Sequence, residues 1–210
     1  MKIYEIFHSL QGESTRVGLP TVFVRLSGCP LRCVYCDTAY AFQGGKNMRV
    51  EQVLERVAAF GTPYVTVTGG EPLAQKECLA LLEKLCDAGY SVSLETGGAL
   101  DTSRVDARVS VILDLKTPGS GEAEKNLWSN LAHLKPADEV KFVLCDRADY
   151  DWAKQTLAER GIADKCTVLF SPVYSRLDPA DLADWVLQDR LPVRVQVQLH
   201  KILWGETPGK

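Results

Sequence analysis

Residues 21–38 read TVFVRLSGCPLRCVYCDT, a short apolar segment followed directly by three closely spaced cysteines. The first part, Val22–Leu26, is predicted as a buried strand because β-branched and other apolar residues dominate it. Cys29, Cys33 and Cys36 follow in a C-x3-C-x2-C spacing. Three thiols this close, on a loop at the end of a strand, predict a metal or metal-cluster site. The local pattern therefore combines one strand of a sheet with a candidate cofactor loop.

The whole chain has the composition of a globular protein. Of its 210 residues, 46% are hydrophobic and 24% are charged, and 24 Lys and Arg against 27 Asp and Glu give a net charge of −3. A slightly acidic chain is not expected to bind nucleic acid through bulk charge. Its longest apolar stretches are too short to predict a membrane helix, and its first residues do not resemble a secretory signal. Seven cysteines, an odd number, favour reduced thiols and hence a cytoplasmic protein over a disulfide framework.

Strand and helix patterns alternate along the chain. The predicted strands are Val22–Leu26, Tyr64–Thr68, Ser91–Glu95, Ser110–Leu115, Val140–Leu144, Thr167–Phe170 and Val193–Leu199. The predicted helices are Val50–Ala58, Cys78–Leu85, Ala148–Arg160 and one that opens at Asp178-Pro179. Apolar residues at i, i+3, i+4 and i+7 indicate the helices, and Gly89 and Gly161 are typical stops.

This alternation predicts an α/β fold with a mostly parallel sheet and right-handed crossovers. A complete eightfold barrel typically needs about 250 residues, and the first 45 residues look mostly like loop. We therefore expect an open, partial βα barrel of about six βα units, with its site at the carboxyl ends of the strands. We expect one domain over 1–210, in which 1–49 carry an N-terminal strand and the cysteine loop, 50–201 the βα repeats and 202–210 a tail.

The cysteine loop, residues 28–38, suits either an iron–sulfur cluster or zinc on spacing alone. A structural zinc normally takes a fourth Cys or His, but His8, His133 and His200 are all distant in the sequence. Three cysteines fit a [4Fe–4S] cluster with one iron open to a small molecule.

A second motif, Gly69-Gly70-Glu71-Pro72, follows the predicted strand Tyr64–Thr68. Two glycines permit close approach of the backbone to a ligand, and Glu71 offers an acceptor for an ammonium group. The alternative is an ordinary tight turn between strand and helix.

Together, the cysteine spacing with an aromatic residue before the last cysteine and the Gly-Gly-Glu-Pro motif resemble the radical S-adenosylmethionine (SAM) superfamily. The resemblance implies a [4Fe–4S] cluster on Cys29, Cys33 and Cys36 with SAM on its open iron. Gly70 and Glu71 would then hold the amino group of SAM.

Four further motifs resemble the QueE family of 7-carboxy-7-deazaguanine synthases. They are Ile6-Phe7-His8-Ser9-Leu10-Gln11-Gly12-Glu13, Cys36-Asp37-Thr38, Glu95-Thr96-Gly97-Gly98 and Gln198-Leu199-His200-Lys201. The family contracts 6-carboxy-5,6,7,8-tetrahydropterin to 7-carboxy-7-deazaguanine with loss of ammonia, assisted by Mg²⁺, in the biosynthesis of queuosine and other deazapurines. The resemblance also implies a reducing partner such as flavodoxin or ferredoxin and a homodimer, without a nucleic-acid or membrane partner.

The same resemblance assigns roles to individual residues. The pterin would contact Leu10, Gln11, Gly12, Glu13, Arg25 and Thr68, with Glu95 and His200 as catalytic residues and Thr38 as a ligand to Mg²⁺. SAM would contact Tyr35, Cys36, Asp37, Gly70, Glu71, Asp114, Leu115, Lys116 and Ser171. Asp114-Leu115-Lys116 stands where relatives carry Ser-Pro-Lys, so this part of the assignment is a departure from the family pattern.

Each role has a structural alternative. Leu10–Gly12 are then an unliganded loop, Arg25 a surface residue and Thr38 a helix cap. Glu95 becomes an ion-pair partner and His200 a structural histidine. Lys201 itself is expected to be a solvated neighbour of His200. For the whole protein, the alternatives are a radical SAM activase that makes a glycyl radical on another protein, and a zinc-stabilised binding module.

Overall fold

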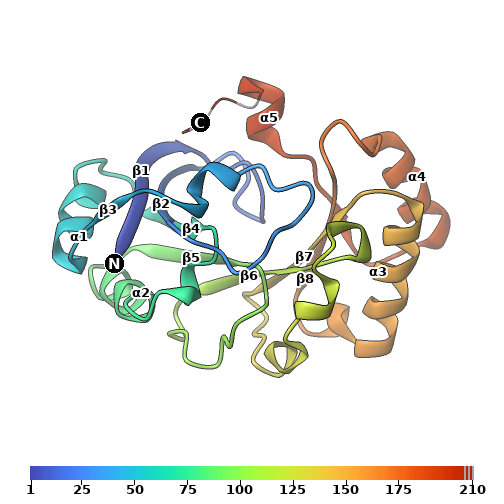
Figure 1. Ribbon diagram of the computed structural model, residues 1–210. Helices are drawn as coiled ribbons and strands as arrows, with labels where there is room; N and C mark the ends of the chain where they lie inside the picture. The colour runs from blue at the N-terminus through green and yellow to red at the C-terminus, as the bar shows by residue number, and fades with distance from the viewer. Residues whose placement is uncertain (206, 208, 210) are drawn as a thin grey trace.

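The computed structural model describes residues 1–205, 207 and 209, which form one nine-stranded sheet with the order β3-β1-β2-β4-β5-β6-β7-β8-β9 (Figure 1). Its strands are β1 (Lys2–Leu10), β2 (Pro20–Leu26), β3 (Lys46–Asn47), β4 (Tyr64–Gly69), β5 (Ser91–Thr96), β6 (Ser110–Leu115), β7 (Glu139–Leu144), β8 (Thr167–Pro172) and β9 (Arg194–Val195). All neighbours from β2 to β9 pair in parallel, whereas β1 pairs antiparallel with β2 and β3. The predicted open and mostly parallel α/β sheet is confirmed.

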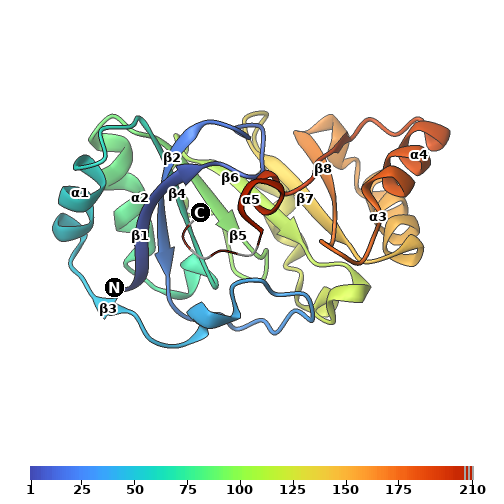
Figure 2. The ribbon, with the colours of Figure 1, turned by 90° about the horizontal axis from the view of Figure 1, so that it is seen from above.

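Four α-helices lie in four of the six parallel crossovers: α1 (Val50–Ala58), α2 (Cys78–Asp87), α3 (Arg147–Arg160) and α4 (Pro179–Asp189). The β5–β6 connection has no α-helix, and the β6–β7 connection contains only short 3-10 turns. Figure 2 shows the sheet curving around an open centre, with α1 and α2 outside one half and α3 and α4 outside the other. Among the described residues, no helix is long and apolar enough to cross a membrane.

Residue alternation along the strands separates a core from a polar interior, because successive side chains of a strand point to opposite faces. On the outer face, Val22, Val24 and Leu26 of β2 join a buried cluster with α1 and α2, and the apolar residues of β6 to β8 form a second one with α3 and α4. The inner face carries polar residues at the intervening positions: Thr66, Thr68, Ser93, Glu95, Asp114 and Lys141. The polar side chains of the strands therefore lie on the inner, concave face of the sheet.

Two segments differ from the sequence prediction. The strand β1 was not among the predicted strands, and it runs for nine residues along β2. The predicted strand Val193–Leu199 shrinks to Arg194–Val195 and is followed by a helix, α5 (Leu199–Trp204).

Hydrogen bonds with the loop after β1 explain the short last strand. The Gln196 side chain bonds the backbone of Ser14 twice, at 2.6 and 2.8 Å, and Leu199 N donates to Gly12 O at 3.0 Å. These bonds draw the segment away from the sheet edge. In the predicted tail 202–210, residues 206, 208 and 210 lie outside the described residues.

A buried carboxylate joins α3 to the loop after β6 and gives a stability prediction. Asp149, 1% exposed, accepts hydrogen bonds from Thr117 Oγ1 at 2.9 Å, Gly119 N at 2.7 Å and Cys145 N at 2.9 Å. Asp149→Ala leaves these donors without their acceptor, so we expect the free energy of unfolding to fall by about 2–4 kcal/mol in urea titrations.

The matched control for this variant is Asp151→Ala on the same helix. Asp151 is 55% exposed and pairs only with Arg147, so its loss should change the free energy of unfolding by less than about 0.5 kcal/mol. Equal effects of the two variants would contradict the structural role of Asp149.

Candidate active site

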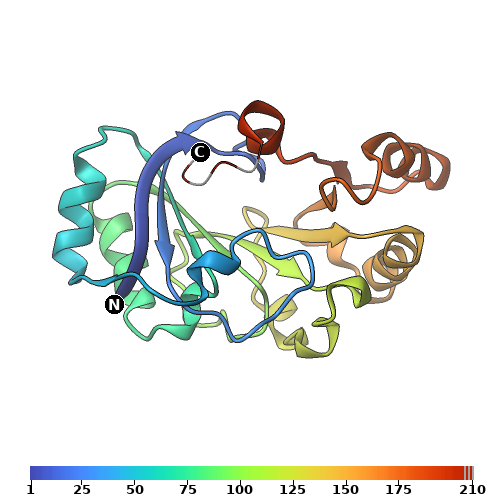
Figure 3. The same cartoon turned by 45° about the horizontal axis from the view of Figure 1, so that its top comes forward.

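A cavity of about 740 Å³ lies inside the curved sheet, at the carboxyl ends of the parallel strands. Figure 3 shows the cysteine loop, in blue, crossing one side of this space, while α5, in red, lies on the other. The cavity brings together most of the predicted site residues: Leu10, Gln11, Gly12, Glu13, Arg25, Cys29, Cys33, Tyr35, Cys36, Asp37, Thr38, Thr68, Gly70, Glu95, Asp114, Lys116 and His200. Residues far apart in the sequence thus line one cavity.

Backbone hydrogen bonds fix the cysteine loop at the mouth of this cavity. Gly28 N donates to Ala41 O at 3.0 Å, and Val34 N donates to Ser120 O at 3.0 Å. Gly70 packs directly against Gly28 and Cys29, and a Cβ at this position would overlap them. The Gly-Gly-Glu-Pro motif was expected to let the backbone approach a ligand closely. In the structure, Gly70 instead allows close packing of the backbone against the cysteine loop.

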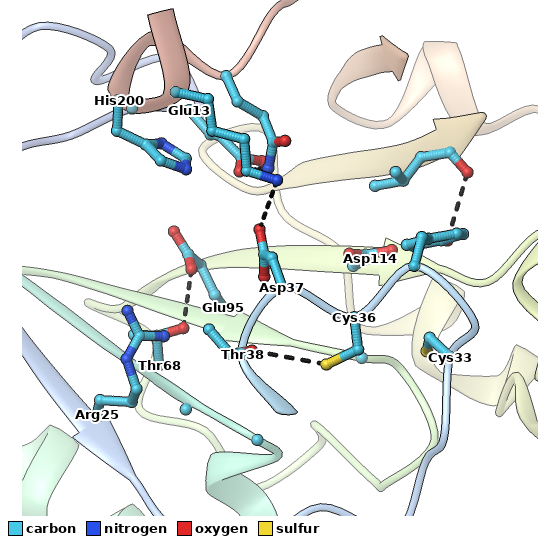
Figure 4. Close-up of a pocket in the computed structure, with 18 of the residues that line it drawn as sticks. Glu13, Arg25, Cys33, Cys36, Asp37, Thr38, Thr68, Glu95, Asp114 and His200 are labelled. Carbon is cyan, nitrogen blue, oxygen red and sulfur yellow. Dashed lines mark hydrogen bonds and ion pairs between the residues drawn. The ribbon is translucent and has the colours of Figure 1, made fainter. Parts of the chain in front are cut away.

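The three cysteines of the loop are half-buried, form no disulfide and line the cavity. Figure 4 shows two of them, Cys33 and Cys36. Within residues 1–205, 207 and 209, no three or more His, Cys, Asp or Glu side chains are gathered closely enough to hold one metal ion. A structural zinc normally takes four Cys or His ligands, and the cysteine loop supplies three. Thiolates that bind different irons of one cluster lie farther apart, and three of them leave the fourth iron open. The donor set fits a [4Fe–4S] cluster.

Two partly exposed carboxyl groups in the cavity, Glu13 and Glu95, have different partners. Glu13 accepts from Lys141 Nζ at 2.7 Å and from Gln198 Nε2 at 2.7 Å. Burial opposes its charge, but Lys141 and Gln198 outweigh this effect and lower the pKa of Glu13 to about 2. Glu95 accepts from Thr68 Oγ1 at 2.9 Å and Gln11 Nε2 at 3.3 Å, and burial raises the pKa of Glu95 above its ordinary value.

Arg25 is not the surface residue of the alternative interpretation, because its side chain is only 13% exposed. Its Nε donates to Glu5 Oε1 at 2.7 Å, and its guanidinium lies 5.6 Å from the Phe7 ring centroid and 5.9 Å from that of Tyr40. Among the described residues, no hydrogen bond uses its two terminal NH₂ groups. These contacts hold the guanidinium on the cavity wall with its outer edge available to an anion.

Comparisons with known proteins identify the family. Residues 23–119 match the radical SAM superfamily. The 7-carboxy-7-deazaguanine synthase of Chlorobaculum tepidum is 50% identical over 208 residues, which cover 98% of this chain and 94% of that protein. The chain belongs to the 7-carboxy-7-deazaguanine synthase family. A relative of the same name from Koribacter versatilis is 42% identical and covers 100% of both chains.

The solved structure of QueE from Escherichia coli resembles this fold with a TM-score of 0.75, at 24% identity over 95% of this chain and 94% of that one. The family is one of radical SAM enzymes, which use a [4Fe–4S] cluster and SAM, and its members also use Mg²⁺. The donor set of the cysteine loop agrees with the cluster, and no other cysteine in the described part of the chain lines the cavity.

Three residues predicted to contact SAM do not line the cavity: Glu71, Leu115 and Ser171. Glu71 is fully buried, and its carboxylate accepts from Thr96 Oγ1 and Gly97 N at 2.8–2.9 Å and from Leu73 N at 3.1 Å. These hydrogen bonds hold the Glu71 carboxylate against the end of β5, and its contact with SAM stays a prediction. Leu115 follows the outward alternation of β6 into the core, and Ser171 is buried within the end of β8.

Thr38 is the last residue of the cysteine loop and follows Asp37, which contacts α5. Thr38 occupies the N-cap position of a 3-10 turn, but its side chain makes no capping hydrogen bond to the described residues, and its Oγ1 lies 3.8 Å from Cys36 Sγ. Lys201 is 8% exposed and pairs with Asp37 at 3.1 Å, so the expectation of a solvated neighbour is wrong. This ion pair ties α5 to the cysteine loop (Figure 4).

The structure adds cavity residues that the sequence analysis missed, above all Lys141 on β7. Asp114, its partner in the β6–β7 register, lies 3.5 Å from Lys141 Nζ and 3.0 Å from Lys116 Nζ. The second oxygen of Asp114 is buried and has no hydrogen-bond partner in the described part of the chain. The sequence does contain a signal for Lys141. It is the one charged residue of the apolar segment Val140–Leu144, at a position whose side chain points to the face opposite the core.

Tyr35 and His200 both line the cavity. The Tyr35 hydroxyl donates to Val143 O at 3.4 Å, and burial raises the pKa of Tyr35. His200 packs against Gly12, where a Cβ would overlap its ring, and burial lowers the pKa of His200. A largely neutral imidazole at pH 7 can donate or accept a hydrogen bond in the cavity.

Proposed function

We propose that this chain is a 7-carboxy-7-deazaguanine synthase that contracts 6-carboxy-5,6,7,8-tetrahydropterin to 7-carboxy-7-deazaguanine with release of ammonia. Full-length identity of 50% with a relative of that name supports the reaction. The structural observation that best supports this reaction is the composition of the cavity. The three cysteines share it with polar side chains from strands β2 to β7. A flat, polar substrate with one carboxylate matches such a wall.

The side chains of the cavity suggest how the substrate is held. Arg25 pairs with the pterin carboxylate through its free guanidinium edge, because a planar fork matches a carboxylate. Glu13 and Gln11 accept and donate along the polar edge of the pterin ring. Glu95, whose pKa is raised by burial, carries or receives a proton near neutral pH.

The remaining assignments concern the cofactors. Cys29, Cys33 and Cys36 hold the cluster, and Asp37, Gly70, Asp114 and Lys116 face the space for SAM. The Thr38 hydroxyl is a hard oxygen ligand suited to Mg²⁺. When bound, the cluster and SAM supply the electron and the organic radical that start the reaction.

We further propose that 1–210 act as one domain, that the electron comes from a flavodoxin or ferredoxin, and that the enzyme is a homodimer. A cluster on free thiols favours the cytoplasm, where thiols stay reduced.

Anaerobic turnover tests the proposed reaction. Reconstituted enzyme, 6-carboxytetrahydropterin, SAM and dithionite should yield 7-carboxy-7-deazaguanine and ammonia in mass spectrometry and ammonia assays, faster with Mg²⁺ than with EDTA. An intact cluster that cleaves SAM yet forms no deazapurine would contradict the assignment and favour an activase or another substrate.

A further inference from the structure

We propose that Lys141 is a positioning residue that holds the Glu13 carboxylate ready for the pterin and, by pairing with Glu13 instead of Glu95, gives the two carboxyl groups different roles. The inference rests on the proposed function, since it names a determinant of substrate binding at the same site. Lys141 stands apart from the residues that family resemblance assigns.

The geometry places Lys141 between the substrate side and the cofactor side of the cavity. Its side chain is 12% exposed on the inner face of β7, with Nζ 2.7 Å from Glu13 Oε2 and 3.5 Å from Asp114 Oδ2. Asp114 has a closer cation, Lys116 at 3.0 Å. Glu13 has no second cation within ion-pair distance among the described residues, so Lys141 is its counter-ion.

Two contacts from different elements fix the orientation of Glu13. Lys141 bonds Oε2, and the Gln198 amide bonds Oε1 at 2.7 Å. A carboxylate has about four lone-pair positions, so two remain for ligand N–H groups. The pyrimidine edge of a pterin presents adjacent N–H donors, which an ionised carboxylate can accept together and a protonated carboxyl cannot.

Glu95 lies in the same cavity but receives only neutral donors, Thr68 and Gln11. The charged and titratable groups that face Lys141 are Glu13, Asp114, Glu95, Lys116 and His200. Although burial alone favours the neutral amine, the carboxylates raise the pKa of Lys141 well above its ordinary value, so it stays charged. The pKa of Glu13 is lowered while that of Glu95 is raised, and such divergence between neighbouring carboxyls indicates separate roles.

Lys141→Met tests the inference by calorimetric binding of 6-carboxytetrahydropterin to anaerobic enzyme without reductant. We expect the Kd of the variant to exceed that of the wild type by about 10- to 100-fold near pH 7. In the wild type, Glu13 with a pKa of about 2 is ionised throughout pH 5–8. In the variant, burial without a counter-ion raises the pKa of Glu13, so the ratio of the two Kd values should increase as the pH falls from 8 to 5.

A double-mutant cycle separates positioning from a general structural effect. If Lys141 acts through Glu13, adding Lys141→Met to Glu13→Gln should cost little further affinity, and Lys141→Arg should restore most of the binding. Lys154→Met, which removes an exposed lysine paired with Asp189, is the matched control and should bind like the wild type. Additive losses in the cycle, or a Kd ratio independent of pH, would overturn the proposal.

A ligand-free measurement distinguishes this inference from the proposed function. The Glu13 carboxyl carbon, followed by ¹³C NMR, should titrate at higher pH in Lys141→Met than in the wild type, whichever substrate the enzyme uses. If the methionine variant does not fold, Lys141→Gln supplies the same comparison. Absence of pterin binding in the wild type would reject the proposed function, whereas an unchanged Glu13 titration would reject the role of Lys141.

Discussion

Cys29→Ala is expected to fold normally, to lose its [4Fe–4S] cluster and to form no deazapurine above the level of a protein-free control. Fe–S clusters are held by cysteine thiolates, and three cysteines line the cavity among the described residues, so one loss leaves two irons without protein ligands. The loop should keep its shape because its backbone hydrogen bonds do not involve the sulfurs. Gly28 N donates to Ala41 O, Val34 N donates to Ser120 O, and Arg32 N donates to the Glu122 carboxylate.

Iron and acid-labile sulfide analysis after anaerobic reconstitution, together with visible absorption, measures the effect. Cys86→Ala, on α2 outside the cavity, is the matched control and should keep its cluster and activity. A Cys29→Ala protein with full iron and sulfide content would show that another side chain holds the cluster. Zinc without sulfide in the wild type would instead support the binding-module alternative.

The sequence predicted the fold well where side-chain periodicity follows burial. The strand Ser110–Leu115 and the helix Val50–Ala58 have the predicted bounds because their apolar residues alone decide which face is buried. The same alternation places Thr68 and Glu95 on the inner face, so neighbouring parallel strands bring them together at 2.9 Å. Motifs on loops at strand ends converge for the same topological reason.

The prediction failed where long-range hydrogen bonds override local pattern. Val193–Leu199 alternates like a strand, but bonds from Gln196 and Leu199 to the loop after β1 replace most of the sheet pairing. Glu71 matches the family motif, yet its burial against Thr96 and Gly97 depends on how β4 and β5 end side by side. Local sequence does not contain these contacts.

The largest effect on substrate affinity is expected from Arg25→Ala, which removes the only arginine fork held on the inner face of β2. Arg25 aligns with Thr68 in the β2–β4 register, one strand from Glu95, so a pterin between these residues brings its carboxylate to the guanidinium. Glu5 and the rings of Phe7 and Tyr40 fix its orientation before the substrate arrives, and this preorganisation lowers the entropic cost of binding.

Loss of a buried, charge-assisted pair costs about 2–5 kcal/mol, so the Kd for 6-carboxytetrahydropterin should rise by on the order of 100-fold or more while iron content stays unchanged. Tetrahydropterin without the 6-carboxylate should bind wild type and variant alike, because it never makes the pair. Arg25→Lys should recover only part of the affinity, since an ammonium cannot offer two parallel N–H bonds. Arg104→Ala, at an exposed position, controls for loss of positive charge. An equal loss of affinity for both ligands would mean that Arg25 supports the cavity wall through Glu5 and Tyr40, whereas loss of iron would place its role at the cysteine loop.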